Sequence, residues 1–395
     1  MLKSFISFAI SNYINRIFIT VDNRITVGYE PGTNIRGMIS TDDIPKGTIL
    51  IHTPGSLVVS AQSTQCQTIA NIVKEMNSGT ESKWKLYFDY DDSDNSHIPS
   101  QWDRNGKAIQ ELQGLPPSGD THRHLDWYQS ACIGEGKEMS DVEMKAFKMF
   151  LTRAADIGLV PMYDLMNHHN GKINTKLQRD ESGGLKVIAS HDIPANTPIY
   201  NTYARSGIES TVEVFNTYGF VEDYPQLWRW SDVDLAELIK ENDKHAHSRY
   251  SDEYLNANNE PNTHHYEVLV ITPSLAALHP TKQLVSILGN GQRSLDEWQQ
   301  LIKAHHINLR ESHARAIHGS AASIREQLPT SIEEDISLIP LEKRRLEKVQ
   351  RMGRIDMKKA DAIQATEFRV AFKKALRLAM KTAEQEAFLK DSEEL

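Results

Sequence analysis

A short turn-and-strand sequence that occurs twice is the feature that most constrains the fold of this chain. The first copy is Asp43-Ile-Pro-Lys-Gly-Thr48-Ile49, and the second is Asp192-Ile-Pro-Ala-Asn-Thr197-Pro-Ile199. Each copy places a proline-containing turn directly before an apolar strand. Because the copies lie about 150 residues apart, we predict that similar strand segments flank a large insertion.

The segment between the two copies predicts a mostly helical insertion, at residues 61–151. Ile69, Ile72 and Val73 fall on one helical face, and apolar residues between Val142 and Leu151 repeat at similar spacing. A loop rich in Asp, Ser, Pro and Gly separates these two stretches, at residues 89–103. Strand patterns lie on both sides of the insertion, which favours a mixed α and β architecture.

The pattern changes to helices from about residue 231 to the C-terminus. Ser294 with Glu297 and Thr330 with Glu333 have the spacing of a capping box. A long apolar stripe follows at i+4 steps, formed by Phe368, Phe372, Leu376 and Met380. We therefore predict a first domain at residues 1–230 and an all-α domain at residues 231–395.

Net charge and cysteine content narrow the classes of function. The 395-residue chain has a formal charge of -9, whereas nucleic-acid binding requires a basic face. An acidic surface instead favours a basic protein partner, because it attracts cations. Cys66 and Cys132 are too few for a disulfide framework or a Cys-rich zinc site. A reducing compartment is therefore indicated, and we expect a cytoplasmic protein.

Residues 1–21 are apolar but do not predict a membrane span. Polar residues between Ser11 and Arg16 interrupt the segment, which is too broken to cross a bilayer. We interpret it as a surface helix that begins the fold. A transit peptide is the alternative, because no acidic residue precedes Asp22. A plastid or nuclear localisation therefore stays open beside the cytoplasm.

The pair Asn167-His168, which follows an apolar strand, is the first candidate for chemistry. Both side chains can donate and accept hydrogen bonds. Taken alone, an Asn-His pair is typical of a turn, and a single tyrosine at a strand end, such as Tyr203, is typical of core packing. In this chain the pair is preceded by Val160-Pro161 and Asp164, and it is followed by Tyr203 and by Tyr218-Gly219-Phe220.

These segments, with others in the same order, resemble the SET-domain protein methyltransferases, in the branch of the Rubisco large-subunit lysine methyltransferase. The blocks are Arg36-Gly37-Met38, Pro54 to Leu57, Ser82 to Tyr87, Glu111 to Gly114, Thr152-Arg153, Leu159 to His168, Tyr203, Ser210, Tyr218 to Phe220 and Thr330 to Asp335. Their order and spacing carry the likeness. The resemblance implies an α+β fold of short β-sheets with a threaded pseudoknot and a helical insertion, followed by an all-α substrate-binding domain.

The resemblance implies that the chain binds S-adenosylmethionine. Asn167 and His168 would hold the methionine and adenine ends of this cofactor, and the Asn amide oxygen suits its ammonium group. The backbone at Arg36 and Gly37 would lie against the cofactor, because glycine allows close approach. Arg153 would pair with the cofactor carboxylate. The alternative for Arg153 is a salt bridge on the surface of a helix.

The resemblance also implies methyl transfer to a lysine of a non-histone protein, with Tyr203 as the catalytic residue. A lysine amine has an ordinary pKa near 10.4, which an apolar channel beside a sulfonium lowers. The Tyr203 hydroxyl would orient this amine for in-line displacement, so that catalysis depends on alignment. Tyr218 would line the lysine channel, and Phe220 would pack by the cofactor or the channel.

Two departures from the family pattern keep other functions open. Ile35 replaces the first Gly of a Gly-x-Gly motif, and Thr211 replaces an Asn. A catalytically silent SET-like protein that binds a partner is therefore one alternative. Methylation of a protein histidine by the same fold is another. Tyr218 favours lysine, because a channel closed by a second tyrosine fits a thin side chain better than a ring.

Other polar clusters do not predict a metal site. The histidine pairs at 245/247, 264/265 and 305/306 mostly lack a carboxylate at ligand spacing and fall in predicted surface helices or loops. The acidic residues at 89–94 lack the Gly and the final Glu of a calcium loop, so we interpret them as a solvated loop. We expect a monomer that acts on a protein substrate, with no nucleic-acid or membrane partner.

Overall fold

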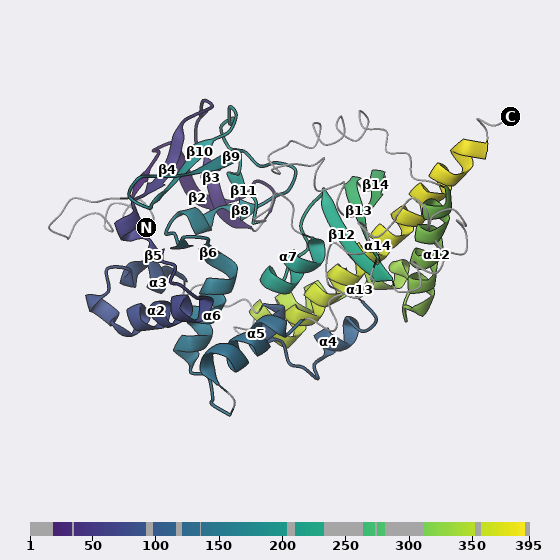
Figure 1. The fold of residues 1–395 in the computed structure, drawn as a ribbon, viewed down its shortest axis with the longest axis horizontal. Helices are drawn as coiled ribbons and strands as arrows, with labels where there is room; N and C mark the ends of the chain where they lie inside the picture. Colours follow the sequence, from purple (N-terminus) through teal and green to yellow (C-terminus); the bar gives the residue numbers. More distant parts are fainter. Residues whose placement is uncertain are drawn as a thin grey trace, which may run out of the picture. The chain divides into compact units, whose positions relative to one another are not determined.

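The chain divides into two compact units (Figure 1). The computed structural model describes residues 19–33, 35–91, 98–115, 121–134, 136–203, 210–232, 264–272, 275–280, 311–351 and 357–391. The first unit comprises Met1–Ser100 and His122–Tyr203, and the second comprises Gln101–Thr121 and Ala204–Leu395. The division therefore differs from the predicted boundary at residue 230, because the units separate after Tyr203 and residues 101–121 belong to the second unit.

Short β-sheets form the part of the first unit that carries the predicted site. A four-stranded antiparallel sheet has the order β1–β4–β10–β9. The strands of the first unit are β1 (Thr20–Val21), β2 (Ile25–Tyr29), β3 (Arg36–Ser40), β4 (Ile49–Thr53), β5 (Val59–Ser60), β6 (Ala154–Ala155), β7 (Gly158–Leu159), β8 (Asn167–His168), β9 (Thr175–Arg179), β10 (Leu185–Ala189) and β11 (Tyr200–Asn201). Leu50, Ile51 and Val187 are buried in the core that these strands enclose.

The two Asp-Ile-Pro turns pack against each other in the first unit. The backbone N–H groups of Ile44 and Ile193 each donate to the carbonyl oxygen of the other at 2.8 Å, and both side chains are buried. The two aspartates bond to the opposite turn: Asp192 accepts from the Lys46 N–H at 2.7 Å, and Asp43 accepts from the Ala195 N–H at 2.8 Å. The two copies of the sequence repeat, which flank the insertion, therefore form hydrogen bonds with each other.

Helices form a second core in the first unit, within the predicted insertion. They are α2 (Gln65–Asn77), α3 (Lys85–Asp91), α5 (Arg123–Tyr128) and α6 (Asp141–Arg153). Ser140 and Glu143 form a capping box at the start of α6. Ile69, Ile72 and Phe147 are fully buried in one cluster. The helical pattern predicted for this segment is confirmed.

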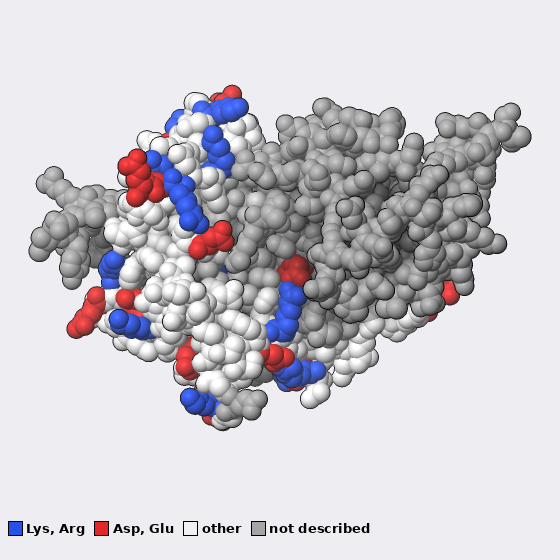
Figure 2. Space-filling view, in the orientation of Figure 1, with Lys and Arg blue, Asp and Glu red and all other residues white. Residues whose placement is uncertain are grey.

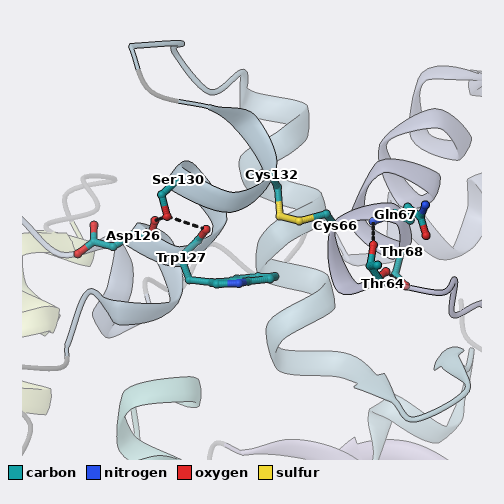
Figure 3. The surroundings of a disulfide bond; sticks show 8 residues. All are labelled: Thr64, Cys66, Gln67, Thr68, Asp126, Trp127, Ser130 and Cys132. Carbon is teal, nitrogen blue, oxygen red and sulfur yellow. Dashed lines mark hydrogen bonds between the residues drawn. A yellow bond between two sulfur atoms is a disulfide. The ribbon is translucent and has the colours of Figure 1, made fainter.

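A disulfide joins Cys66 and Cys132 within this helical core (Figure 3). Cys66 lies in the first turn of α2, and Cys132 lies in the π turn Gln129–Ile133 that follows α5. Their Cα atoms are 5.2 Å apart, a distance that a disulfide requires. The expectation of two reduced cysteines is therefore corrected. The cytoplasmic expectation rested on those reduced cysteines and loses that support.

The second unit combines helices with an antiparallel sheet, so the expectation of an all-α domain is wrong, whereas the α+β class is confirmed. The sheet has the order β12 (Gln226–Asp232), β13 (His264–Thr272) and β14 (Leu275–Pro280). The run Val268-Leu-Val-Ile271 in β13 is rich in β-branched residues, which favour strands. His264 and His265 therefore begin a strand, and the histidine pairs at 245/247 and 305/306 lie outside the described residues.

The helices of the second unit pack around the predicted apolar stripe. They are α4 (Lys107–Glu111), α7 (Thr211–Tyr218), α12 (Glu311–Gln327), α13 (Ile332–Arg351) and α14 (Met357–Asp391). Phe368 and Phe372 of α14 are fully buried and contact Trp228. The rings of Phe368 and Phe215 lie 4.3 Å apart. No helix that the structure describes is long and apolar enough to span a membrane.

A buried ion network ties α13 to α14 in the second unit. Asp335 accepts from Arg369 at 2.6 and 2.9 Å and from Lys373 at 2.7 Å. Lys373 also donates to Thr330, and Arg369 also pairs with Glu111 of α4. The carboxylates of Asp335 and Glu111 therefore pair with the cations of Arg369 and Lys373. This pairing offsets the free-energy cost of burying the charges.

Candidate functional site

Two short strands bring the predicted site segments together in the first unit. β8 pairs in parallel with β11, so that Asn167 lies opposite Tyr200 and His168 lies opposite Asn201 (Figure 1). Before β8, Met162 has a φ of 75°, which is strained for a residue with a side chain. This residue precedes the 3-10 turn Tyr163–Leu165 and directs the apolar strand into the Asn-His pair.

The side chain of Asn167 is held by a carboxylate and a backbone carbonyl. Its Nδ2 donates to Glu30 Oε1 at 2.7 Å and to the Arg36 carbonyl oxygen at 3.0 Å. Both partners only accept, so the amide nitrogen must face them and Oδ1 must face away. Gly37 permits this arrangement, because a Cβ at position 37 would lie 2.4 Å from Nδ2. The glycine is therefore required by the Asn167 amide itself.

His168 connects β8 to Tyr203. Its Nδ1 accepts from the Tyr203 backbone N–H at 3.0 Å, and the two rings lie 5.2 Å apart. Burial, with a smaller contribution from the neighbouring His169, lowers the pKa of His168 to about 3. His168 is therefore neutral at pH 7. Its proton is on Nε2, because Nδ1 serves as an acceptor.

The hydroxyl of Tyr203 is oriented by the backbone next to the Asn-His pair. It donates to the carbonyl oxygen of Met166 at 3.0 Å. On the adjoining strand, Asn201 donates to the hydroxyl of Tyr163 at 2.6 Å. Burial raises the pKa of Tyr163 to about 12, so this phenol stays neutral. The structure therefore brings Asn167, His168 and Tyr203 together, as the sequence analysis required.

Arg153 has an intramolecular partner in the first unit. Its Nη1 donates to the Asp164 carbonyl oxygen at 3.2 Å and lies 3.7 Å from Asp164 Oδ2. Tyr87 donates to the same carboxylate oxygen at 2.6 Å. This pairing corresponds to the salt bridge that was the alternative for Arg153. Its contact with a cofactor carboxylate stays a prediction.

The aromatic residues assigned to the lysine channel lie in the second unit. Tyr218 ends α7 and Phe220 follows it, with their ring centroids 6.1 Å apart. Thr211, one of the departures from the family pattern, donates to Glu222 at 2.8 Å. Burial raises the pKa of Glu222 to about 8. The roles of Tyr218 and Phe220 at a channel or cofactor stay predictions.

Glu30 and Tyr200 belong to the site but were not predicted from the sequence. Glu30 is 8% exposed, and its Oε2 accepts from the Tyr200 hydroxyl at 2.8 Å. Tyr200 could have been found, because it lies only three residues before the predicted Tyr203. Glu30 carries no such signal, because an acidic residue before a Pro-Gly turn is typical of an exposed surface position.

Charged side chains are interspersed on the face drawn in Figure 2. Over the described part of that face, Lys and Arg alternate with Asp and Glu, and neither sign forms a continuous patch. The formal charge of -9 is therefore not gathered into an acidic surface there. Among the residues that the structure describes, no group of three His, Cys, Asp or Glu side chains could hold a metal ion.

Comparisons with known proteins find a matching domain family and similar folds. A family model described as SET domain matches residues 35–204. The SET domain of LSMT bound to lysine and AdoHcy is similar with a TM-score of 0.55 and 17% identity, covering 93% of this chain and 88% of that chain. Rubisco LSMT bound to AdoMet has a TM-score of 0.54 and 16% identity, covering 93% and 89%. Rubisco LSMT bound to sinefungin and monomethyllysine has a TM-score of 0.55 and 17% identity, covering 93% and 89%. A comparison with curated proteins gives no match.

Residues 35–204 match the SET-domain model, and this range contains Gly37, Asn167, His168 and Tyr203. The chain as a whole has the fold of the Rubisco LSMT structures. The α+β class implied by the ordered sequence blocks is therefore confirmed, whereas the all-α second domain is not. The departures at Ile35 and Thr211 do not prevent this fold.

Proposed function

We propose that this chain is an S-adenosylmethionine-dependent protein-lysine N-methyltransferase that acts on a non-histone protein. One observation carries the proposal: Tyr203 donates its backbone N–H to His168, so the predicted catalytic tyrosine meets the predicted cofactor-binding pair. The SET-domain match and the likeness to Rubisco LSMT bound to AdoMet and to lysine support the same reaction.

The described residues fit such a cofactor. Asn167 directs Nδ2 toward Glu30 and Arg36, so its Oδ1 can accept from an ammonium group. Gly37 gives the Asn167 amide room to lie against the backbone of β3, because a Cβ at position 37 would lie 2.4 Å from Nδ2. His168 is neutral and adds no positive charge beside a cationic ligand. Bound S-adenosylmethionine supplies an electrophilic methyl group.

Tyr203 would align the substrate amine. Its hydroxyl proton is directed to the Met166 carbonyl, and a hydroxyl oxygen can also accept a hydrogen bond. Neither His168, with its low pKa, nor Tyr163, with its high pKa, exchanges a proton readily at pH 7. The lysine must therefore arrive as a neutral amine, which an apolar environment near a cation favours.

Labelling of a cell lysate tests the proposed function. The protein is incubated with lysate and S-adenosylmethionine that carries a radiolabelled methyl group, and a Tyr203→Phe variant serves as the comparison. We expect a labelled protein band with the wild type and a loss of at least about a hundredfold in labelling rate with the variant, because the amine loses its aligning group.

Mass spectrometry of the labelled protein then identifies the modified residue. Methyl-lysine supports the proposal, whereas methyl-histidine identifies the alternative enzyme of the same fold. A catalytically silent binding protein would give no labelling and no heat of binding with S-adenosylhomocysteine. A labelled histone would reject the non-histone substrate.

A further inference from the structure

Glu30 is a buried carboxylate whose described partners are all neutral. Its Oε1 accepts from Asn167 and its Oε2 accepts from Tyr200, at 2.7 and 2.8 Å. No Lys, Arg or His within the described ranges forms an ion pair with it. Burial of an ionised carboxylate costs free energy unless donors or a cation compensate the charge. Two neutral donors leave the net negative charge in place.

Three strand segments meet at this carboxylate. Glu30 follows β2 at the start of the turn into β3, Asn167 begins β8, and Tyr200 begins β11. Because Tyr200 and Asn167 are register partners in the parallel pair, their side chains reach the two oxygens of one carboxylate. The arrangement therefore fixes the β2–β3 hairpin to the strands that carry the Asn-His pair.

We propose that Glu30 is a positioning residue of the cofactor site, which locks the Asn167 amide and supplies negative charge behind it. The inference rests on the proposed function. Both Nδ2 protons of Asn167 are engaged, by Glu30 and by the Arg36 carbonyl, so Oδ1 is the acceptor presented to an ammonium group. The Glu30 charge lies one hydrogen bond behind that acceptor and attracts the same cation at short range.

Binding of S-adenosylhomocysteine measured by calorimetry tests this role without catalysis. Glu30→Ala removes the hydrogen bond and the charge, and we expect the Kd to rise by about tenfold to a hundredfold. Glu30→Gln keeps an acceptor for Asn167 but lacks the charge, so its Kd should lie between those of the wild type and Glu30→Ala. The exposed Glu138→Ala is the matched control and should bind as the wild type does.

A ligand without the amino-acid group separates positioning from a general loss of structure. Methylthioadenosine has no ammonium group, so Glu30→Ala should bind it within twofold of the wild type, whereas a collapsed site would lose both ligands. Thermal unfolding of each variant provides the second check. Glu30→Gln, which can retain both hydrogen bonds, should unfold near the wild-type temperature.

A double-mutant cycle with Asn167→Ala tests whether Glu30 acts through Asn167. If it does, Glu30→Ala should weaken S-adenosylhomocysteine binding clearly less in the Asn167→Ala background than alone. Equal losses in both backgrounds, or a Glu30→Ala variant that binds within twofold of the wild type, would overturn the inference. Failure of the wild type itself to bind S-adenosylhomocysteine would instead reject the proposed function.

Discussion

The two units bury carboxylates in opposite electrostatic settings. Asp335 of the second unit is paired with two cations, Arg369 and Lys373, within 3 Å. Glu30 of the first unit accepts only from an amide and a phenol. The paired cations compensate the charge of Asp335 and hold helices together, whereas an amide and a phenol bring no countercharge to Glu30. The two units therefore compensate their buried carboxylates in different ways.

A third carboxylate, Glu222 of the second unit, shows the limiting case. It is fully buried, and within the described structure its side chain has one hydrogen-bond donor, the Thr211 hydroxyl. Burial therefore raises its pKa to about 8, so it is mostly protonated at pH 7. The three buried acids therefore differ in their partners. Asp335 has two cations, Glu30 has two neutral donors, and Glu222 has a single neutral donor.

Asp335→Ala gives the largest expected effect, because it leaves Arg369 and Lys373 buried without their common partner. We expect the free energy of unfolding to fall by about 3–5 kcal/mol. Urea unfolding followed by circular dichroism measures it. Glu333→Ala is the control, since Glu333 and Arg377 form an exposed pair that should contribute nothing measurable. Equal stability of the two variants would contradict a structural role for the Asp335 network.

In the first unit a disulfide, and not an ion network, joins two segments that are distant in the sequence. Replacing both cysteines by serine opens a loop of 66 residues and should cost about 4 kcal/mol of stability. The reductant TCEP should lower the unfolding temperature of the wild type but not of the Cys66→Ser, Cys132→Ser double variant, because the chain has no other cysteine. A wild type insensitive to TCEP would show that the bond is absent in solution.

The Glu222→Gln variant tests, through the pH dependence of stability, whether Glu222 is buried in its protonated form. The folded state keeps Glu222 protonated up to about pH 8, whereas the unfolded chain ionises near its ordinary pKa of 4.5. The contribution of Glu222 to stability is therefore complete below pH 4.5 and is lost as pH rises toward 8. At pH 9 the glutamine variant should be more stable than the wild type by about 4–5 kcal/mol. The exposed Glu347→Gln should show no such gain.

Local patterns predicted most of the fold. The paired Asp-Ile-Pro turns, the insertion helices and the Phe368 stripe each depend on spacing that the sequence displays directly. The sheet of the second unit was missed, because the apolar run of β13 carries no strict alternation and lies among helical patterns. The disulfide was missed for a different reason, since only the folded helices bring Cys66 and Cys132 together.

The sequence predicted the motif residues of the site but not the residues that hold them in place. Asn167, His168 and Tyr203 carry ordered sequence signals, and the structure brings them together. Glu30 lies 137 positions from Asn167 and 170 from Tyr200, so no local pattern could join them. Arg153 fitted a cofactor role in the sequence but has Asp164 beside it in the structure. Tertiary contacts, not residue types, decide which polar groups support a site.

Two glycines that face each other in one hairpin give the smallest but most selective test of the Glu30 setting. Gly28 and Gly37 are register partners on β2 and β3, and neither has a left-handed backbone. A Cβ at Gly37 would lie 2.4 Å from Asn167 Nδ2, whereas a Cβ at Gly28 would meet the flexible Ile39 side chain, whose Cδ1 lies at 3.3 Å.

Gly37→Ala should therefore displace the Asn167 amide and raise the Kd for S-adenosylhomocysteine about tenfold, a difference of about 1.4 kcal/mol. Gly28→Ala should bind within twofold of the wild type, because the side chain of Ile39 can shift. Calorimetry on both variants, with thermal unfolding as the check on folding, measures the difference. Equal losses of affinity in both variants would show that the hairpin as a whole affects binding. They would contradict a specific role for the contact between Gly37 and the Asn167 amide.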